Sequence, residues 1–428
     1  MRWVAVVLIV VGALVAAAFP APEPPAPQST PDPVAPSVAV CPVEEGSGRA
    51  TDLSVLSSVD DTVSVTVFGA GSPQDTVDTA TGPTGATSFP SSQLGAVGLM
   101  GAVVEMPGRP FAAGFATAGV ESLSGEPCFH KPSPRQTFLS GGSTAEGHQF
   151  ELVLLNPYSG EAVVALAVQS ESGRETNDRF ESLVVPAKGS TIVDFTRLIP
   201  ARDTVSVTVE TLSGSAVAIG TQRRGGDNAS WRAVEAGSDW YLPIPSGLTG
   251  ARVELATPMN AEIDYQVDLY GPDGIFEAWQ SGTLSPRGRA SVDLAELAGA
   301  VAAIRVVATG PLVPTLWTDS AETGMAATTA SPVQATTWLL PGASAPSGGS
   351  GTLILVNTGI EPTVARLRTI QDRATEEEIS LGVDAVVEIP LTSARGYRVD
   401  SDGFIVAMWV GRRGSAALVA MGVPLGDG

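Results

Sequence analysis

The chain has 428 residues, of which 43% are hydrophobic and 16% charged, and it carries a net charge of −21. This composition excludes a disordered chain and predicts two to four domains. The acidic balance excludes nucleic acid as a partner, and it excludes binding to an anionic membrane through charge, because both need basic patches. The 47 glycines and 33 prolines favour short strands with many turns over long helices.

The N-terminus combines an apolar run with a proline-rich tract. Arg2 precedes the run from Trp3 to Phe19, which as a helix would span about 26 Å, slightly short of a bilayer core. The run ends in three alanines, a pattern typical of a signal peptidase site. We therefore expect an apolar helix that acts as a signal anchor or a cleaved signal peptide, and a Pro-rich tether behind it. Since Arg2 should stay in the cytoplasm, the rest is predicted to be extracytoplasmic, anchored to the membrane by this helix or secreted.

Four copies of one unit follow the tether. Their first strands align at Cys41, Leu139, Leu242 and Leu340, which are 98, 103 and 98 residues apart. Each copy contains seven or eight short alternating strands, which is typical of a β-sandwich of about 100 residues. A β-propeller is the alternative, but it requires similarity at about half this period, and we find none. We predict an all-β fold of tandem immunoglobulin-like β-sandwich repeats. The expected parts are 1–19 (signal anchor or signal peptide), 20–36 (linker), 37–134 (repeat 1), 135–236 (repeat 2), 237–334 (repeat 3) and 335–428 (repeat 4).

The two cysteines lie near the ends of repeat 1. Cys41 is in its first strand and Cys128 among its last residues, where the two ends of one sandwich could meet. We predict a disulfide between them, which export would permit, and two buried free thiols are the alternative.

Reactive constellations are scarce. His130 and His148 are predicted to be surface-loop histidines, since no nucleophile motif accompanies them. Cys and His are too few for a zinc site, whereas acidic turns leave calcium open. The many acidic residues also leave a carboxylate pair for glycoside hydrolysis open. We expect no cofactor.

A repeated basic motif is the main candidate for an interaction surface. R-R-G occurs in equivalent closing strands of repeats 2 and 4, and tryptophans occupy the same strand of repeats 3 and 4. Aromatic residues beside arginine could form a surface for sugars or acidic polymers. The alternative is that the tryptophans are core or domain-interface residues and the arginines offset the acidic surface. The residues concerned are Arg223, Arg224, Arg412, Arg413, Trp317 and Trp409.

The repeated motifs carry a family resemblance. Leu152–Pro157 reads L-V-L-L-N-P, Leu353–Asn357 reads L-I-L-V-N, and Val185–Ser190 reads V-P-A-K-G-S. With the apolar start and the Pro-rich tether, these runs resemble a family of exported actinobacterial cell-envelope proteins of unknown function. Repeat 3 departs from the pattern at Thr257. The resemblance implies a role at the cell envelope and supplies no catalytic residues.

We therefore expect a non-catalytic exported cell-envelope scaffold or interaction protein. A cell-wall glycan-binding module and an extracellular hydrolase using a carboxylate pair are the two alternatives. Expected partners are the membrane, through an uncleaved helix, and an envelope protein or glycan. The short junctions at 235–240 and 330–338, with tryptophans beside them, predict that repeats 2 to 4 form a semi-rigid rod. Repeat 1 is expected to move more freely.

Overall fold

The computed structural model describes residues 38–425 except 47, 58–60, 70–71, 81–84, 107–109, 131–134, 272–273, 298, 321–323, 371–374, 393 and 395. The predicted signal segment and tether lie outside the described residues. No helix in the described part of the chain is long and apolar enough to cross a membrane. Residues Ala35–Asp427 form one compact unit.

Repeat 1 is built from two four-stranded layers joined at one corner. Their orders are β4-β3-β6-β1 and β5-β2-β7-β8, and β1 also pairs with β2 where the two layers meet. The strands are β1 (Val38–Gly46), β2 (Arg49–Ser57), β3 (Thr62–Gly69), β4 (Ser72–Ala80), β5 (Ala86–Pro90), β6 (Gly98–Glu105), β7 (Phe111–Ala118) and β8 (Leu123–Pro127).

Repeat 2 has the same two layers, with orders β12-β11-β15-β9 and β14-β10-β16-β17, and the short β13 also pairs with β11. The elements are β9 (Gln136–Gly142), β10 (His148–Asn156), β11 (Ala162–Ser170), β12 (Gly173–Glu175), η1 (Asp178–Phe180), β13 (Leu183–Val185), β14 (Gly189–Asp194), α2 (Phe195–Leu198), β15 (Val205–Ser213), β16 (Val217–Arg224) and β17 (Asp227–Arg232).

In repeats 3 and 4 one long strand passes from the first layer into the second. β23 and β30 each pair with three or more strands and serve both layers of their repeat. The elements of repeat 3 are β18 (Gly237–Ile244), β19 (Ala251–Ala256), β20 (Ile263–Gly271), β21 (Gly274–Leu284), β22 (Arg289–Asp293), η2 (Ala295–Leu297), β23 (Ala302–Ser320) and β24 (Gly324–Thr329). Those of repeat 4 are β25 (Ala335–Pro341), β26 (Ser350–Asn357), β27 (Thr363–Thr369), β28 (Glu376–Leu381), β29 (Val386–Leu391), β30 (Gly396–Arg413), β31 (Ala416–Met421) and β32 (Val423–Leu425).

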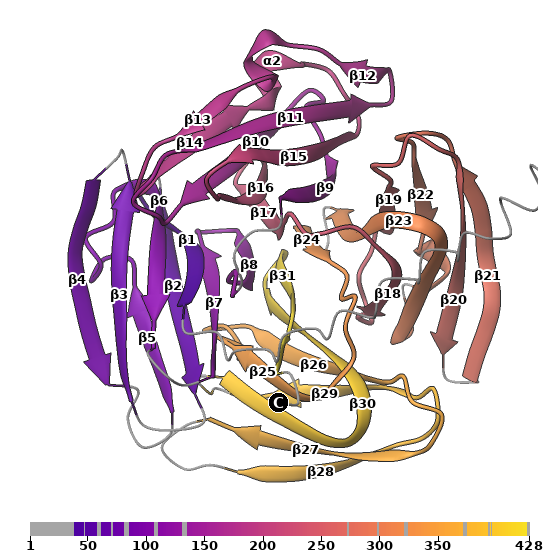
Figure 1. Ribbon diagram of the computed structural model, residues 1–428. Helices are drawn as coiled ribbons and strands as arrows, with labels where there is room; N and C mark the ends of the chain where they lie inside the picture. The colour runs from indigo at the N-terminus through magenta and orange to yellow at the C-terminus, as the bar shows by residue number, and fades with distance from the viewer. Residues whose placement is uncertain are drawn as a thin grey trace, which may run out of the picture. The chain divides into compact units, whose positions relative to one another are not determined.

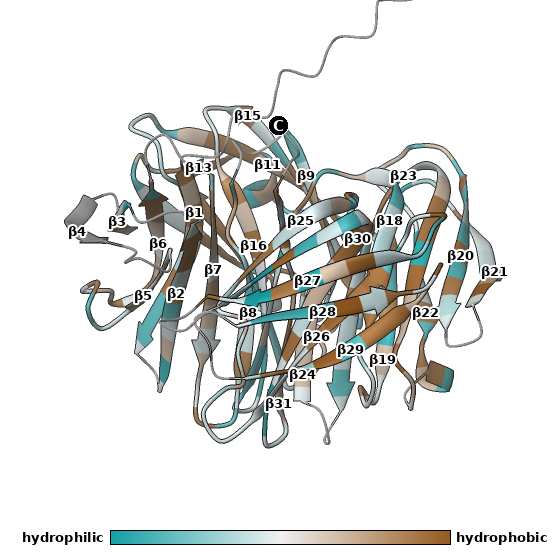
Figure 2. Cartoon of the chain, turned by 90° about the horizontal axis from the view of Figure 1, so that it is seen from below, coloured by the Kyte–Doolittle hydropathy of each residue, from teal (hydrophilic) through white to brown (hydrophobic). Residues whose placement is uncertain are grey.

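All four repeats therefore share one strand order, and the predicted all-β fold of tandem sandwiches is confirmed. The alternating sequences build it because alternate side chains of a strand point to opposite faces of the sheet. In β11 every second residue is buried, from Ala162 to Ser170. Figure 2 shows the same change between hydrophobic and hydrophilic residues along many strands.

The asparagine of the repeated motif closes the turn after the second strand. Asn156 donates from Nδ2 to the carbonyl oxygens of Gly160 (2.7 Å) and Val185 (3.2 Å), and its Oδ1 accepts from the next-but-one N–H. Asn357 makes the same set of contacts in repeat 4. In repeat 3, Thr257 Oγ1 accepts from the Met259 N–H at 3.2 Å and so replaces the asparagine in this turn. The motif that carries the family resemblance is therefore structural.

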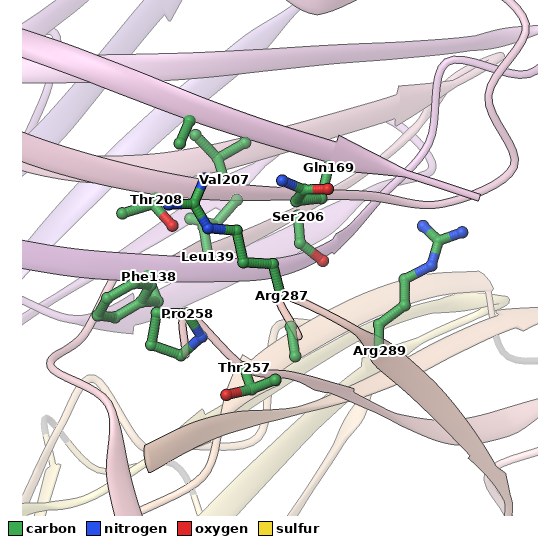
Figure 3. Close-up of a pocket in the computed structure, with 12 residues that line it drawn as sticks. Phe138, Leu139, Gln169, Ser206, Val207, Thr208, Thr257, Pro258, Arg287 and Arg289 are labelled. Atoms are coloured by element: carbon green, nitrogen blue, oxygen red, sulfur yellow. The ribbon is translucent and has the colours of Figure 1, made fainter. Parts of the chain in front are cut away.

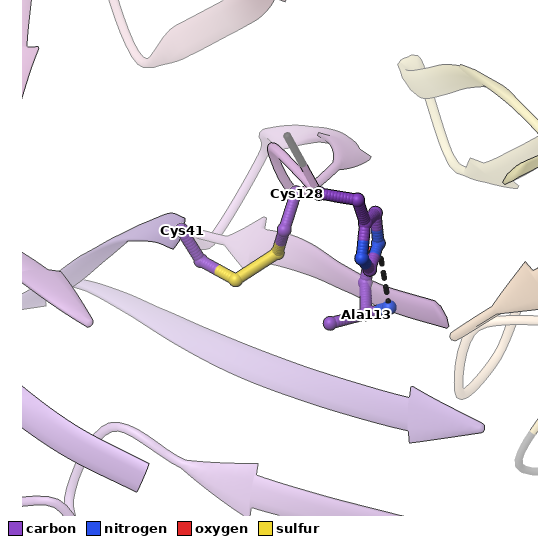
Figure 4. The surroundings of a disulfide bond; sticks show 4 residues. Cys41, Ala113 and Cys128 are labelled. Atoms are coloured by element: carbon purple, nitrogen blue, oxygen red, sulfur yellow. Dashed lines mark hydrogen bonds between the residues drawn. A yellow bond between two sulfur atoms is a disulfide. The ribbon is translucent and has the colours of Figure 1, made fainter. Parts of the chain in front are cut away.

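The predicted disulfide between Cys41 and Cys128 is present, and both cysteines are fully buried in the core of repeat 1 (Figure 4). It lies beside a bridge between Val40 and Phe129, which brings the two ends of the repeat together. Matching bridges join Phe138 with Val234 and Tyr241 with Ser331 in the next two repeats.

The last strands of the repeats bring the four sandwiches together. β8 contacts β17, β17 contacts β24, β24 contacts β31, and β31 returns to β8 (Figure 1). The rod prediction is therefore wrong, and so is the expectation of a freely moving repeat 1. The tryptophans near the junctions, Trp231, Trp240 and Trp338, are fully buried.

Candidate functional site: the four seams between repeats

Each repeat packs against the previous one in the same head-to-tail manner. In three seams, strands of the second layer of one repeat lie on the first strand of the preceding repeat: β19 and β23 on β9, β26 and β30 on β18, and β2 and β7 on β25. In the remaining seam, β14 of repeat 2 lies against β3 and β6 of repeat 1. We call these contacts seams 1/2, 2/3, 3/4 and 4/1. A head-to-tail contact that closes on itself forms a ring, here within one chain.

The first arginine of each R-R-G motif reaches back to the preceding repeat. Arg223 bonds Glu151 in its own repeat (2.9 Å) and Glu44 of repeat 1 (3.4 Å), so it spans seam 1/2. Arg412 donates from Nη2 to the Ser246 carbonyl oxygen of repeat 3 at 2.5 Å, across seam 3/4.

The second arginine of each motif reaches forward to the next repeat. Arg224 pairs with Asp319 of repeat 3 at 2.5 Å, across seam 2/3. Arg413 donates to the carbonyl oxygens of Gly119 and Ser122 of repeat 1, across seam 4/1. Two motifs therefore place one arginine in each of the four seams.

The six residues suggested as an interaction surface do not form one exposed face. The four arginines bind groups inside the molecule, and Trp317 and Trp409 are only 2% and 5% exposed. Trp317 fills seam 2/3, where its Nε1 lies 3.5 Å from the Ser140 carbonyl oxygen and its ring meets Trp231 edge to face. The alternative reading, of tryptophans as core or interface residues, describes their positions.

A buried ionisable pair lies where the last strands meet. Glu126 of β8 has a fully buried side chain, and its Oε2 is 3.6 Å from Nε of Arg232 of β17. Burial raises the pKa of the Glu126 carboxyl to about 8, although the nearby Arg232 charge, Thr328 and Thr329 oppose the shift. Burial likewise lowers the pKa of Arg232. The sequence offers little signal for this cluster, since Glu126 precedes a proline and looks like a turn residue.

The two histidines are not exposed loop residues as predicted. His130 Nε2 accepts from the Ala113 N–H at 3.1 Å, and burial lowers the pKa of His130 to about 4. His148 lies in β10, next to Gln222 of β16 at 3.3 Å, and partial burial lowers its pKa as well. In both cases burial favours the neutral imidazole over the charged form.

The seams differ in how completely they are filled. The cavity in seam 1/2 is about 20 Å³, and so is the one in seam 2/3, where Arg287 extends toward Thr208 of repeat 2 (Figure 3). Seam 4/1 contains a cavity of about 390 Å³ between the second layer of repeat 1 and the 342–347 loop, β30 and β31 of repeat 4. That volume lies in the range of small-ligand pockets, about 300–1,000 Å³. Nowhere in the described ranges do three or more His, Cys, Asp or Glu side chains gather as a metal site would need.

The described residues thus define a protein of four β-sandwiches joined head to tail through seams. The chain belongs to a family of unknown function, DUF5719, whose match covers residues 113–392, more than half of the sequence. No curated protein matches the sequence.

Three solved structures show a distant likeness. One is a tetra-tandem repeat from the extending region of a large adhesion protein, with 11% identity over 85% of this chain and 91% of that one and a TM-score of 0.11. The second is two B repeat units of the collagen-binding protein of Staphylococcus aureus, with 10% identity, 84% and 93% coverage and a TM-score of 0.11. The third is an α-L-rhamnosidase of Streptomyces avermitilis complexed with L-rhamnose, with 8% identity, 85% and 53% coverage and a TM-score of 0.14. At these scores the likeness carries no argument.

Proposed function

We propose that the protein is a non-catalytic scaffold or interaction protein of the cell envelope, exported and either held by its N-terminal helix or released. The buried disulfide supports export, because disulfides persist in oxidising compartments and are rare in the cytosol. The four sandwich repeats, in a chain whose family has no known function, are consistent with a structural or binding role.

The observation that carries the interaction role is a set of exposed apolar side chains in and near the turn after the second strand of repeats 2 and 4. In repeat 4, Ile360 in this turn is 92% exposed and Phe404 of β30 is 53% exposed, and the Thr358 N–H bonds the Phe404 carbonyl oxygen, which joins the turn to β30. In repeat 2, Tyr158 is exposed in the corresponding turn and Leu212 is exposed near the end of β15. Exposed apolar clusters on a folded protein mark contact surfaces for partners.

Site-specific photo-crosslinking in the native cell tests this role. A photo-reactive residue at Ile360 or Phe404 is expected to join the chain to one defined envelope component, identified by mass spectrometry. The same residue at buried Trp317 is the control and should give only crosslinks within the chain. Catalytic turnover abolished by substituting one carboxylate would instead favour the hydrolase, and the absence of any discrete crosslink at either exposed position would remove the interaction role.

Export has its own test. Cys41 and Cys128 should resist alkylation in intact cells until a reductant is added, and protease added to spheroplasts should degrade the chain. Free, alkylated thiols together with protection from protease would place the protein in the cytoplasm and contradict the proposal.

A further inference from the structure

The cavity of seam 4/1 arises from two alanines in repeat 1. The closing strands of the four repeats can be aligned through their cross-strand partners. Leu53 of repeat 1 lies opposite Phe115, and the equivalent Leu152 of repeat 2 lies opposite Gly220, so Phe115 and Gly220 are equivalent positions. In repeats 3 and 4 the corresponding pairs are Val253 with Leu316 and Leu353 with Trp409. Two positions of this strand face the seam. They are Ala116, Thr221, Trp317 and Val410 at one, and Ala118, Arg223, Asp319 and Arg412 at the other.

Repeat 1 therefore has methyl groups where the other repeats have larger side chains that fill their seams. Trp317 occupies seam 2/3, and Arg223 and Arg412 occupy seams 1/2 and 3/4. With Ala116 and Ala118 in their place, the opposite wall of seam 4/1 is not reached, and about 390 Å³ stays open.

Polar groups line this space without partners of their own. Asp52, which sits opposite Ala116, is exposed to solvent at the cavity, and its carboxylate makes no hydrogen bond or ion pair with any described residue, whereas its counterpart Glu151 pairs with Arg223. Trp409 is 95% buried, yet its Nε1 donates to no described residue, unlike the indoles of Trp240 and Trp338. Both groups line the cavity and are therefore available to a ligand without the loss of a contact within the described part of the protein.

The charges and surfaces of the cavity define the ligand class. Asp52 offers acceptors, while Arg413 on the opposite wall has five N–H donors, only part of which the carbonyl oxygens of Gly119 and Ser122 use. A cationic ligand would be repelled by the Arg413 charge, and an anionic ligand would be repelled by the Asp52 charge. Between them lie apolar walls from Trp409 and Leu418, and four serines that each donate and accept, Ser54, Ser88, Ser344 and Ser347.

We propose that the cavity of seam 4/1 binds a neutral oligosaccharide. Sugar hydroxyls both donate to Asp52 and accept from Arg413 and the Trp409 indole, and the C–H faces of the ring cover the apolar wall. This site deepens the proposed function by naming a glycan as one partner, but it is separate from the exposed turns of repeats 2 and 4.

Saturation-transfer NMR on the full-length protein tests the site with maltotriose, cellotriose, chitotriose and mannotriose as probes. At least one trisaccharide should receive saturation, and Ala118→Arg should weaken its binding at least tenfold, because the new side chain enters the cavity as Arg223 enters seam 1/2. Val120→Arg adds the same charge two residues away at a position 89% exposed, and it should leave binding unchanged.

Ala116→Trp is the second filling variant and Asp52→Asn removes the charged acceptor; both should weaken binding, with thermal melting showing that each variant folds. The proposal is overturned when no trisaccharide binds at millimolar concentration, when only the charged probes agmatine or benzoate bind, or when folded Ala118→Arg binds as well as wild type. Because the crosslinking test uses other residues, its failure and the failure of this site can be told apart.

Discussion

Glu126 should make the protein less stable as the pH rises above neutrality. Its pKa is raised by burial from 4.5 to about 8, so over this interval the folded state binds more protons than the unfolded state. By linkage, the stability from the protonated carboxyl is complete below pH 4.5 and is lost as the pH rises toward 8. The direction is opposite to that of a carboxylate held ionised by a salt bridge.

The effect of Glu126 on the free energy of unfolding is easiest to separate from that of other groups above pH 6.5. His130 has its pKa lowered from 6.5 to about 4, so its contribution to stability increases between those values and opposes that of Glu126. At pH 6.5 the unfolded-state histidine is still half protonated, so it opposes the Glu126 effect by only a few tenths of a kcal/mol above this pH, and His148, whose pKa is also lowered, acts in the same direction. The free energy of unfolding should then fall by roughly 1 kcal/mol between pH 6.5 and pH 8, since one pKa unit corresponds to about 1.4 kcal/mol.

Urea denaturation of the full-length protein at pH 6.5 and pH 8 is the assay. The Glu126→Gln variant keeps the shape of the side chain but cannot ionise, so its stability should change much less over this interval. Glu151→Gln, in a partly exposed ion pair with Arg223, is the matched control and should retain the wild-type decrease. An equal decrease in wild type and Glu126→Gln would refute the reasoning.

Three further changes test the seams and the disulfide. Arg412→Ala removes the charged hydrogen bond across seam 3/4 and should cost about 1.5–3 kcal/mol in denaturant titrations; an unchanged midpoint would show that this contact contributes nothing. Replacing Cys41 and Cys128 by alanine opens a loop of 87 residues and should cost up to about 4–5 kcal/mol, measured against wild type under non-reducing conditions. Gly125→Ala would place a Cβ against the backbone of β7 and a side chain of β31, and should cost about 1–3 kcal/mol, whereas Gly160→Ala, with open space at its Cβ, should melt like wild type.

The strands of each repeat could be predicted because their signal is local. Alternating runs such as Thr204–Val209 show which face is buried whatever the neighbouring domain does. The repeat period in the sequence indicated four units, and the expected meeting of the two ends of repeat 1 indicated the disulfide. Local reasoning did miss that β23 and β30 are continuous, since the glycines at 310 and 403 look like turns.

The seams could not be predicted because their residues look like ordinary surface residues. An arginine that bridges two domains has the same local sequence as one in solvent, and an aspartate such as Asp319 shows nothing of its distant partner. Close contacts between a backbone and a distant side chain also leave no signal in the sequence. A Cβ at Gly141 would collide with Trp317, 176 positions away, and hydrophobic periodicity does not indicate that contact. The repeated R-R-G motif was visible in the sequence, but the register of the strands was needed to know which seams its arginines bridge.

The alternation of that motif is a consequence of how the seams close. Because neighbouring arginines on a strand point to opposite faces, one R-R-G run serves the seam behind its repeat and the seam ahead of it. A motif in every repeat would place two arginines in each seam, where the charges are already paired. A motif in every second repeat supplies one arginine per seam only when the number of repeats is even, as it is here. Because repeat 1 does not need this motif, its closing strand can carry small residues. The cavity of seam 4/1 therefore opens without loss of the arginine that bonds across that seam.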